Sequence, residues 1–201
     1  MKNKIYLFID GTNLYAGQYE LFGPQKYLDF GLLIKNVEQK LRIKFEKIYF
    51  YASYSPKSKK PNKKEKLFLK NEAMFYKSVK KHKKVIFFSG YRSATSGKEK
   101  EVDVKLTADL ICFGFLNKYS TVYLMTGDAD FLQALFALKK YHNDKKIFIL
   151  NIQNKILFRG AFYFKTFIID LKKPYKTKPN FLTFQKYEFI ELDWRDLVRS
   201  V

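Results

Sequence analysis

Acidic residues follow two apolar, β-branched runs that lie far apart in the chain. Asp10 ends the first run within Phe8–Asn13, and Asp128 and Asp130 follow the second run within Thr126–Phe131. In an open parallel sheet, ligands bind outside the carboxyl ends of the strands. Carboxylates gathered there, without His or Cys partners, suit a hard, oxygen-loving cation such as Mg²⁺ or Mn²⁺. The two motifs therefore predict a divalent-metal site.

A third acid, Asp103, stands between β-branched residues at the start of an expected helix and can lean into the same crevice. Each acid also has a structural alternative. Asp10 with Gly11 is an ordinary turn after a strand, and Asp128 and Asp130 would cap the next helix. Taken together, acids at the ends of neighbouring strands favour a metal site, because carboxylates sharing a cleft repel one another unless a cation lies between them.

A cation held by these acids would lower the pKa of a bound water and neutralise charge on a phosphate. Asp130 is expected to be a ligand or to orient the attacking water. Asn13 and Thr126 are expected to orient the acids without binding the metal themselves. Asn13 is equally suited to contacting phosphate or capping a turn. Asp109, six residues after Asp103, projects about 120° away from it on a helix and is assigned to a second tier.

The charge of the chain indicates a polyanionic partner. Its 201 residues include 39 Lys and Arg against 19 Asp and Glu, a net charge of +20. Part of the lysine excess is explained by an AT-rich codon bias, but bias does not explain clustering: residues 54–100 hold 15 Lys and Arg against 3 Glu. Nucleic acid is favoured over a merely solubilising surface and over a membrane surface.

Specific basic residues are expected to hold RNA phosphates beside the acids. They lie on the loop that enters the Asp103 helix and in the Lys57–Lys66 segment; the residues are Arg92, Lys98, Lys100, Lys63 and Lys64. Tyr51, Tyr54 and Tyr91 are placed to stack unpaired bases, but packing is the more ordinary role for them. Binding to such a track would depend steeply on salt.

Strands alternate with helices along most of the chain. Strands are expected over 4–9, 47–54, 85–90, 121–125 and 146–151, and helices over 30–42, 62–83, 102–117 and 129–141, with a loop from the first strand to Pro24. This alternation predicts a doubly wound α/β fold with a mainly parallel sheet. Phe162–Leu171 would add an edge strand. Residues 1–171 are expected to form one domain, and 172–201 an extension of unassigned role.

The motifs at 8–13, 100–104 and 126–131, in this order and spacing, resemble the NYN domain, a branch of the PIN-like nuclease superfamily, and most closely its LabA-like group. The resemblance covers residues 3–152. It implies a PIN-like three-layer α/β/α sandwich with a central, mainly parallel sheet of five or six strands. It also implies Mg²⁺- or Mn²⁺-dependent endoribonuclease activity, with four acids as metal-binding and catalytic residues: Asp10, Asp103, Asp128 and Asp130. Glu101 is a departure, because the family often has Gly there.

Two other functions remain as alternatives. A catalytically inactive PIN-like module would bind RNA or a protein without cutting, although an inactive site has no reason to keep mutually repelling acids. A phosphatase of the haloacid dehalogenase type would need a nucleophilic Asp two residues before Asp10, where this chain has Phe8. Cytoplasmic localisation is the default, since no apolar run reaches membrane-spanning length and no signal sequence is evident. RNA is the expected partner, no membrane is, and homodimer formation is left open.

Overall fold

Seven strands form one parallel sheet, in the order β10-β9-β8-β7-β1-β3-β4. The computed structural model describes residues 4–92, 99–171 and 187–200, and this count applies to those residues. The sheet is larger than the five or six strands predicted, because β10 adds to it outside β9. The strands are β1 (Ile5–Asp10), β3 (Lys47–Ala52), β4 (Val85–Ser89), β7 (Thr121–Met125), β8 (Lys146–Ile152), β9 (Lys165–Asp170) and β10 (Tyr187–Glu191).

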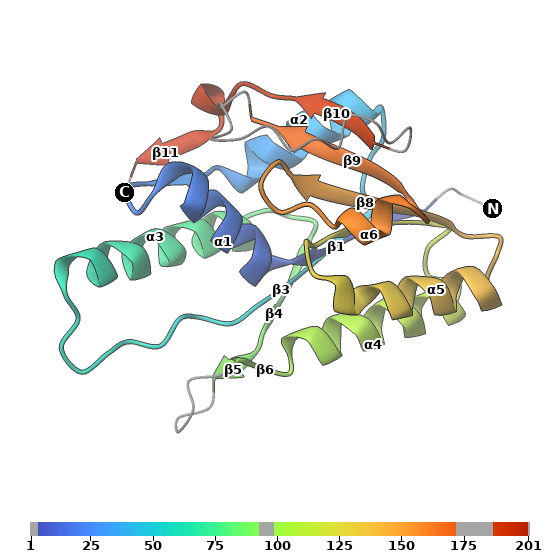
Figure 1. The fold of residues 1–201 in the computed structure, drawn as a ribbon, viewed down its shortest axis with the longest axis horizontal. Helices are drawn as coiled ribbons and strands as arrows, with labels where there is room; N and C mark the ends of the chain where they lie inside the picture. The colour runs from blue at the N-terminus through green and yellow to red at the C-terminus, as the bar shows by residue number, and fades with distance from the viewer. Residues whose placement is uncertain (1–3, 93–98, 172–186, 201) are drawn as a thin grey trace.

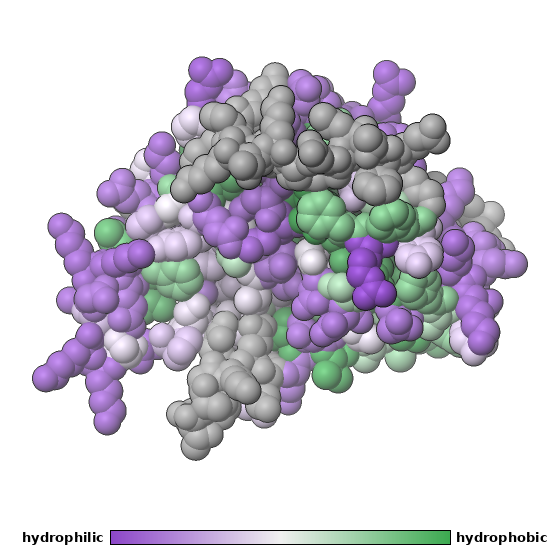
Figure 2. Space-filling view, viewed as in Figure 1, coloured by the Kyte–Doolittle hydropathy of each residue, from purple (hydrophilic) through white to green (hydrophobic). Residues whose placement is uncertain are grey.

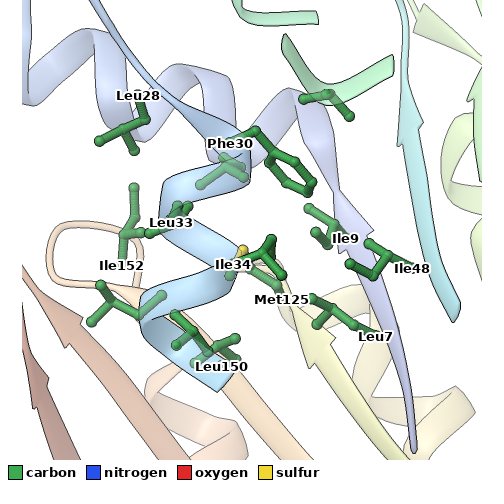
Figure 3. Packing of buried hydrophobic residues seen from close by; sticks show 14 of the residues in the cluster. Leu7, Ile9, Leu28, Phe30, Leu33, Ile34, Ile48, Met125, Leu150 and Ile152 are labelled. Atoms are coloured by element: carbon green, nitrogen blue, oxygen red, sulfur yellow. The ribbon is translucent and has the colours of Figure 1, made fainter. Parts of the chain in front are cut away.

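Helices cover both faces of this sheet, as the predicted α/β alternation requires (Figure 1). The helices α1 (Gly11–Phe22), α2 (Phe30–Leu41) and α3 (Lys63–Lys80) pack on one face, and α4 (Val102–Phe115) and α5 (Leu132–Tyr141) pack on the other. Successive β1 side chains alternate between the two cores, so that Ile9 enters the first and Phe8 the second. Figure 3 shows the first core, where Leu33 and Ile34 of α2 lie against the strand residues.

The loop predicted between the first strand and Pro24 is wrong, because α1 begins directly after Asp10. The Asp10 side chain caps this helix by accepting the Asn13 N–H at 2.9 Å. Gly11 suits the tight junction, since a Cβ there would lie 2.1 Å from Cε1 of Phe50. Asp-Gly therefore marks a helix start here and not the turn that the dipeptide usually indicates.

The C-terminal segment packs against the domain. After β10, a short 3₁₀ turn, η3 (Trp194–Asp196), leads into β11 (Val198–Ser200), which pairs antiparallel with β2 (Lys26–Leu28). The Trp194 ring lies 5.8 Å from the Phe22 ring, and the Asp29 N–H donates to the Leu197 carbonyl at 2.6 Å. Residues 187–200 thus contribute to the first core; the domain boundary at residue 171 stays a prediction.

Three short elements complete the described chain. β5 (Tyr91–Arg92) and β6 (Glu99–Lys100) pair as an antiparallel ribbon before α4, η1 (Ala129–Phe131) precedes α5, and α6 (Phe158–Ala161) follows β8. Figure 1 places the ribbon at the bottom of the view and α6 beside β8. No helix within 4–92, 99–171 or 187–200 is long and apolar enough to cross a bilayer.

Candidate functional site

Polar side chains occupy the carboxyl ends of three adjacent strands, β1, β7 and β8, on one face of the sheet. Asp10, Thr126 and Asn151 each lie two residues after a residue of the second core, so each points toward the face covered by α4 and α5. All three are buried, with exposures of 6%, 1% and 1%. Polar side chains at the end of an apolar sheet must find polar partners.

Asp10 and the second acidic motif are joined through the Thr126 hydroxyl. This hydroxyl donates to Oδ2 of Asp10 at 2.9 Å and accepts the Asp128 N–H at 3.1 Å. Asn13 makes a second link, because its Oδ1 accepts the Gly127 N–H at 3.0 Å. The two motifs, more than 100 residues apart, therefore share one hydrogen-bonded edge, and Asn13 and Thr126 hold it together.

Asp128 and Asp130 take up different positions in the second motif. The Asp128 side chain is half-buried and caps η1, with Oδ1 accepting the Asp130 N–H at 2.9 Å. Asp130 is exposed on η1. The capping role expected as an alternative for Asp128 is thus present, and it engages one of its two carboxylate oxygens.

Asp103 is exposed in the first turn of α4. The residue before the helix, Glu101, has φ of 71° and makes no side-chain capping bond. A left-handed conformation favours Gly over a residue with a Cβ. This is a physical reason for the Gly that the sequence comparison led us to expect in place of Glu101. This chain adopts the same turn with Glu101, at a cost on the order of 1 kcal/mol.

Tyr51 lies beside Asp10 across β1 and β3 and connects this edge to α4. The two residues are register partners, and the Tyr51 hydroxyl donates to Oδ2 of Asp109 at 2.9 Å. Burial, together with the bond to Asp109 and its charge, raises the pKa of Tyr51 far above its ordinary value. The hydroxyl therefore stays protonated and remains a donor. Asp109, assigned to a second tier from the sequence, thus fixes α4 against the sheet.

The donor chemistry of this edge suits a hard cation held by few protein groups. Among the described residues, no group of three or more His, Cys, Asp or Glu side chains lies close enough to hold a metal ion. Mg²⁺ is commonly held by one or two carboxylates, with water and substrate phosphates completing its coordination. Asp10 and Asp128, linked through Thr126, match that number; Asp103 and Asp130 lie in more exposed positions.

The lysine-rich segment leaves the sheet at the same edge. Residues 53–62 follow the carboxyl end of β3, and the six lysines between Lys57 and Lys66, including Lys63 and Lys64, are exposed. Two acids of α3 hold the segment in place: Glu72 accepts from the Ser55 N–H at 2.9 Å, and Glu65 accepts from the Ser58 N–H at 3.0 Å. Three of these lysines are therefore presented on an anchored loop, and the other three in the first turn of α3.

The other predicted RNA contacts cannot be placed in the same way. Lys98 lies outside the described residues, and Arg92 and Lys100 are described only as backbone positions in β5 and β6. Their proposed role stays a prediction.

Asn151 is a residue of this edge that the sequence reasoning missed. Its Nδ2 donates to the Thr126 carbonyl at 2.5 Å, and its Oδ1 accepts the Leu157 N–H at 3.4 Å. A single amide inside the otherwise apolar Ile147–Ile152 run was the available signal, because a buried amide needs partners.

Comparison with known proteins identifies a family and one solved structure of similar fold. A model of the NYN domain matches residues 4–164. The crystal structure of a Vibrio parahaemolyticus protein of unknown function superposes with a TM-score of 0.58 and 20% sequence identity, covering 83% of this chain and 92% of that one. This likeness concerns the fold alone. No curated protein sequence matches the chain.

Proposed function

The chain belongs to the NYN domain family, and from this premise we propose that it is a divalent-metal-dependent endoribonuclease of PIN-like fold. The observation that carries the proposal is the shared edge, in which Asp10 and Asp128 are joined through Thr126. Membership in the LabA-like group is part of the proposal. Ligands of open parallel sheets bind outside the carboxyl ends of the strands, which is where these two carboxylates lie.

Asp10 and Asp128 would hold Mg²⁺ or Mn²⁺. Asp103 and Asp130 would be further ligands, or would orient the attacking water by accepting a hydrogen bond from it. When bound, the cation supplies the charge that neutralises phosphate oxygens and acidifies water. Thr126 and Asn13 position the carboxylates, since each bonds across the two motifs. Tyr51 and Asp109 fix α4, whose first turn carries Asp103.

RNA is the proposed substrate, and the lysine-rich segment is proposed to guide it. Lys57–Lys66 begins beside the acid edge, and Lys63 and Lys64 occupy the first turn of α3. Arg92, Lys98 and Lys100 are proposed to contact the flanking phosphates. A net charge of +20 would attract RNA from a distance and make binding salt-dependent.

A second candidate is a binding module that holds RNA without cutting it. The observation favouring it is that no group of three acids gathers among the described residues. The two candidates differ in one measurable property, which is metal-dependent cleavage.

The deciding experiment is a denaturing-gel assay with end-labelled RNA, single-stranded and structured, in Mg²⁺, Mn²⁺ or EDTA. Asp10→Asn and Asp128→Asn remove charge while keeping an oxygen that can cap. Glu46→Gln is the matched control, because Glu46 is exposed at the amino end of β3, the opposite edge of the sheet.

Metal-dependent cutting by the wild type and by Glu46→Gln, lost in both Asp variants, would support the nuclease. Tight RNA binding without cutting in either metal would favour the binding module. Cutting that persists in EDTA would contradict the metal-dependent reaction.

A further inference from the structure

Three aromatic side chains are exposed on α6 and in the turn that follows it. Phe158, Phe162 and Tyr163 are 48%, 51% and 52% exposed. The Tyr163 ring stands edge-on to Phe136, with centroids 4.9 Å apart and planes at 86°, so packing fixes its orientation. Figure 2 shows apolar surface where Figure 1 places α6, next to strongly hydrophilic side chains. Grouped exposed aromatics mark a contact surface more often than scattered ones do.

Hydrogen bonds tie α6 to the acid edge. Asn151 bonds both the Thr126 carbonyl and the N–H of Leu157, the residue directly before α6. The loop before α6 also packs on the second acidic motif: a Cβ on Gly127 would lie 3.2 Å from the Lys155 carbonyl. A molecule bound to the acids would therefore pass close to Phe158 at the start of α6. Phe162 and Tyr163 lie further along the chain, just before the amino end of β9.

The charge around α6 suits a polyanion. Arg159 is exposed on α6 itself, and the Lys139 ammonium lies 5.6 Å from the Phe164 ring, which neighbours Phe136. A second copy of this chain is a poorer occupant, since both copies carry a net charge of +20. Three half-exposed aromatic rings offer only about 200–400 Å², whereas a stable dimer buries about 800 Å² on each partner.

We propose that Phe158, Phe162 and Tyr163 form a stacking platform for unpaired RNA bases that begins at Phe158, beside the acid edge. This proposal rests on the proposed function and adds a substrate preference to it. Aromatic side chains stack bases that are splayed out of a helix, while a duplex keeps its bases paired and inaccessible. The platform therefore selects single-stranded segments, with Arg159 placed to contact the adjoining phosphate.

The test measures binding in EDTA, so that its readout does not depend on cleavage. Fluorescence anisotropy follows labelled single-stranded RNA and a duplex of equal length with the wild type and with F158A/F162A/Y163A. The matched control is F115A/Y141A, which removes two exposed rings at the amino edge of the sheet, where α4 and α5 end. Phe158→Ala alone is measured as well, and thermal melting verifies that each variant is folded.

The platform variant should bind single-stranded RNA about 5- to 100-fold more weakly, corresponding to the loss of one stacked base. Its affinity for duplex, and both affinities of F115A/Y141A, should stay within about twofold of the wild type. Unchanged single-strand affinity in the platform variant and in Phe158→Ala would overturn the proposal. So would equal losses for single strand and duplex, or a loss of self-association in place of RNA binding, which would identify a protein interface.

Failure of the platform and failure of the nuclease are separable. Single-strand binding that depends on α6, without cleavage in Mg²⁺ or Mn²⁺, would uphold the platform and reject the nuclease. Metal-dependent cleavage with RNA affinity indifferent to α6 would reject the platform and uphold the nuclease.

Discussion

Thr126→Val tests the link between the two acidic motifs. Valine keeps the shape of threonine but removes the hydroxyl that donates to Asp10 and accepts from the Asp128 N–H. A hydrogen bond to a charged group contributes about 1.5–3 kcal/mol, and an unsatisfied N–H costs about 1 kcal/mol where water can partly reach it. Because Thr126 is 1% exposed, water cannot replace the hydroxyl at Asp10. The expected destabilisation is about 2–4 kcal/mol.

Urea denaturation and thermal melting measure this loss. The expected fall in melting temperature is about 5–15 °C, at 2–4 °C per kcal/mol for a chain of this size. Thr126→Ser is the control: it keeps the hydroxyl and loses one methyl, so it should cost only about 1 kcal/mol. RNA cleavage should fall with Val and persist with Ser. If Val is as stable as Ser, the hydroxyl does not bridge the motifs and this account of the edge is wrong.

Four further outcomes are expected. Asp103→Asn should abolish cleavage but change the melting temperature by less than about 2 °C, because Asp103 is exposed; unimpaired cleavage would exclude it from the reaction. Mn²⁺ should raise the melting temperature of the wild type more than that of Asp10→Asn, and equal shifts would count against the metal site. Replacing the six lysines of 57–66 with Gln should flatten the salt dependence of RNA affinity, by up to about 4 in logarithmic slope; an unchanged slope would show that they do not touch RNA. Burial pushes the pKa of Glu38 up, but bonds from Lys84, Phe45 and Lys44 outweigh it and hold the pKa below its ordinary value. Glu38 therefore stabilises the fold above its unfolded pKa of about 4.3, and this contribution is lost as the pH falls through the lower folded pKa. In Glu38→Gln, the stability measured by circular dichroism should depend less on pH over that range.

The sequence predicted the part of the fold that local patterns encode. The alternation of apolar runs with amphipathic helices gave the parallel α/β architecture, and the order of the motifs gave the NYN family. The prediction failed over residues 10–24, because Asp10-Gly11 is compatible both with a turn and with the start of a helix. In the structure Asp10 caps a helix, and the close approach of Phe50, distant in sequence, requires glycine at position 11.

The number of strands and the burial of each acid depend on tertiary contacts that sequence patterns do not encode. β10 carries Glu188 and Glu191 and becomes a strand through its pairing with β9. The spacing predicted that Asp10, Asp103 and Asp128 lie at one edge of the sheet, but it could not predict that Asp10 is buried and Asp103 exposed. The linking role of Asn151 likewise depends on the path of the loop after β8.

The strand order has a consequence for synthesis of the chain. β1 lies between β3 and β7, and the bond from Thr126 to Asp10 joins residues 116 positions apart. Until residue 126 has left the ribosome, β1 can pair with β3 but not with β7. Pairings between residues so far apart in sequence form slowly. The acid edge is thus completed late in folding, and an N-terminal fragment ending before β7 would carry Asp10 without the partners that position it.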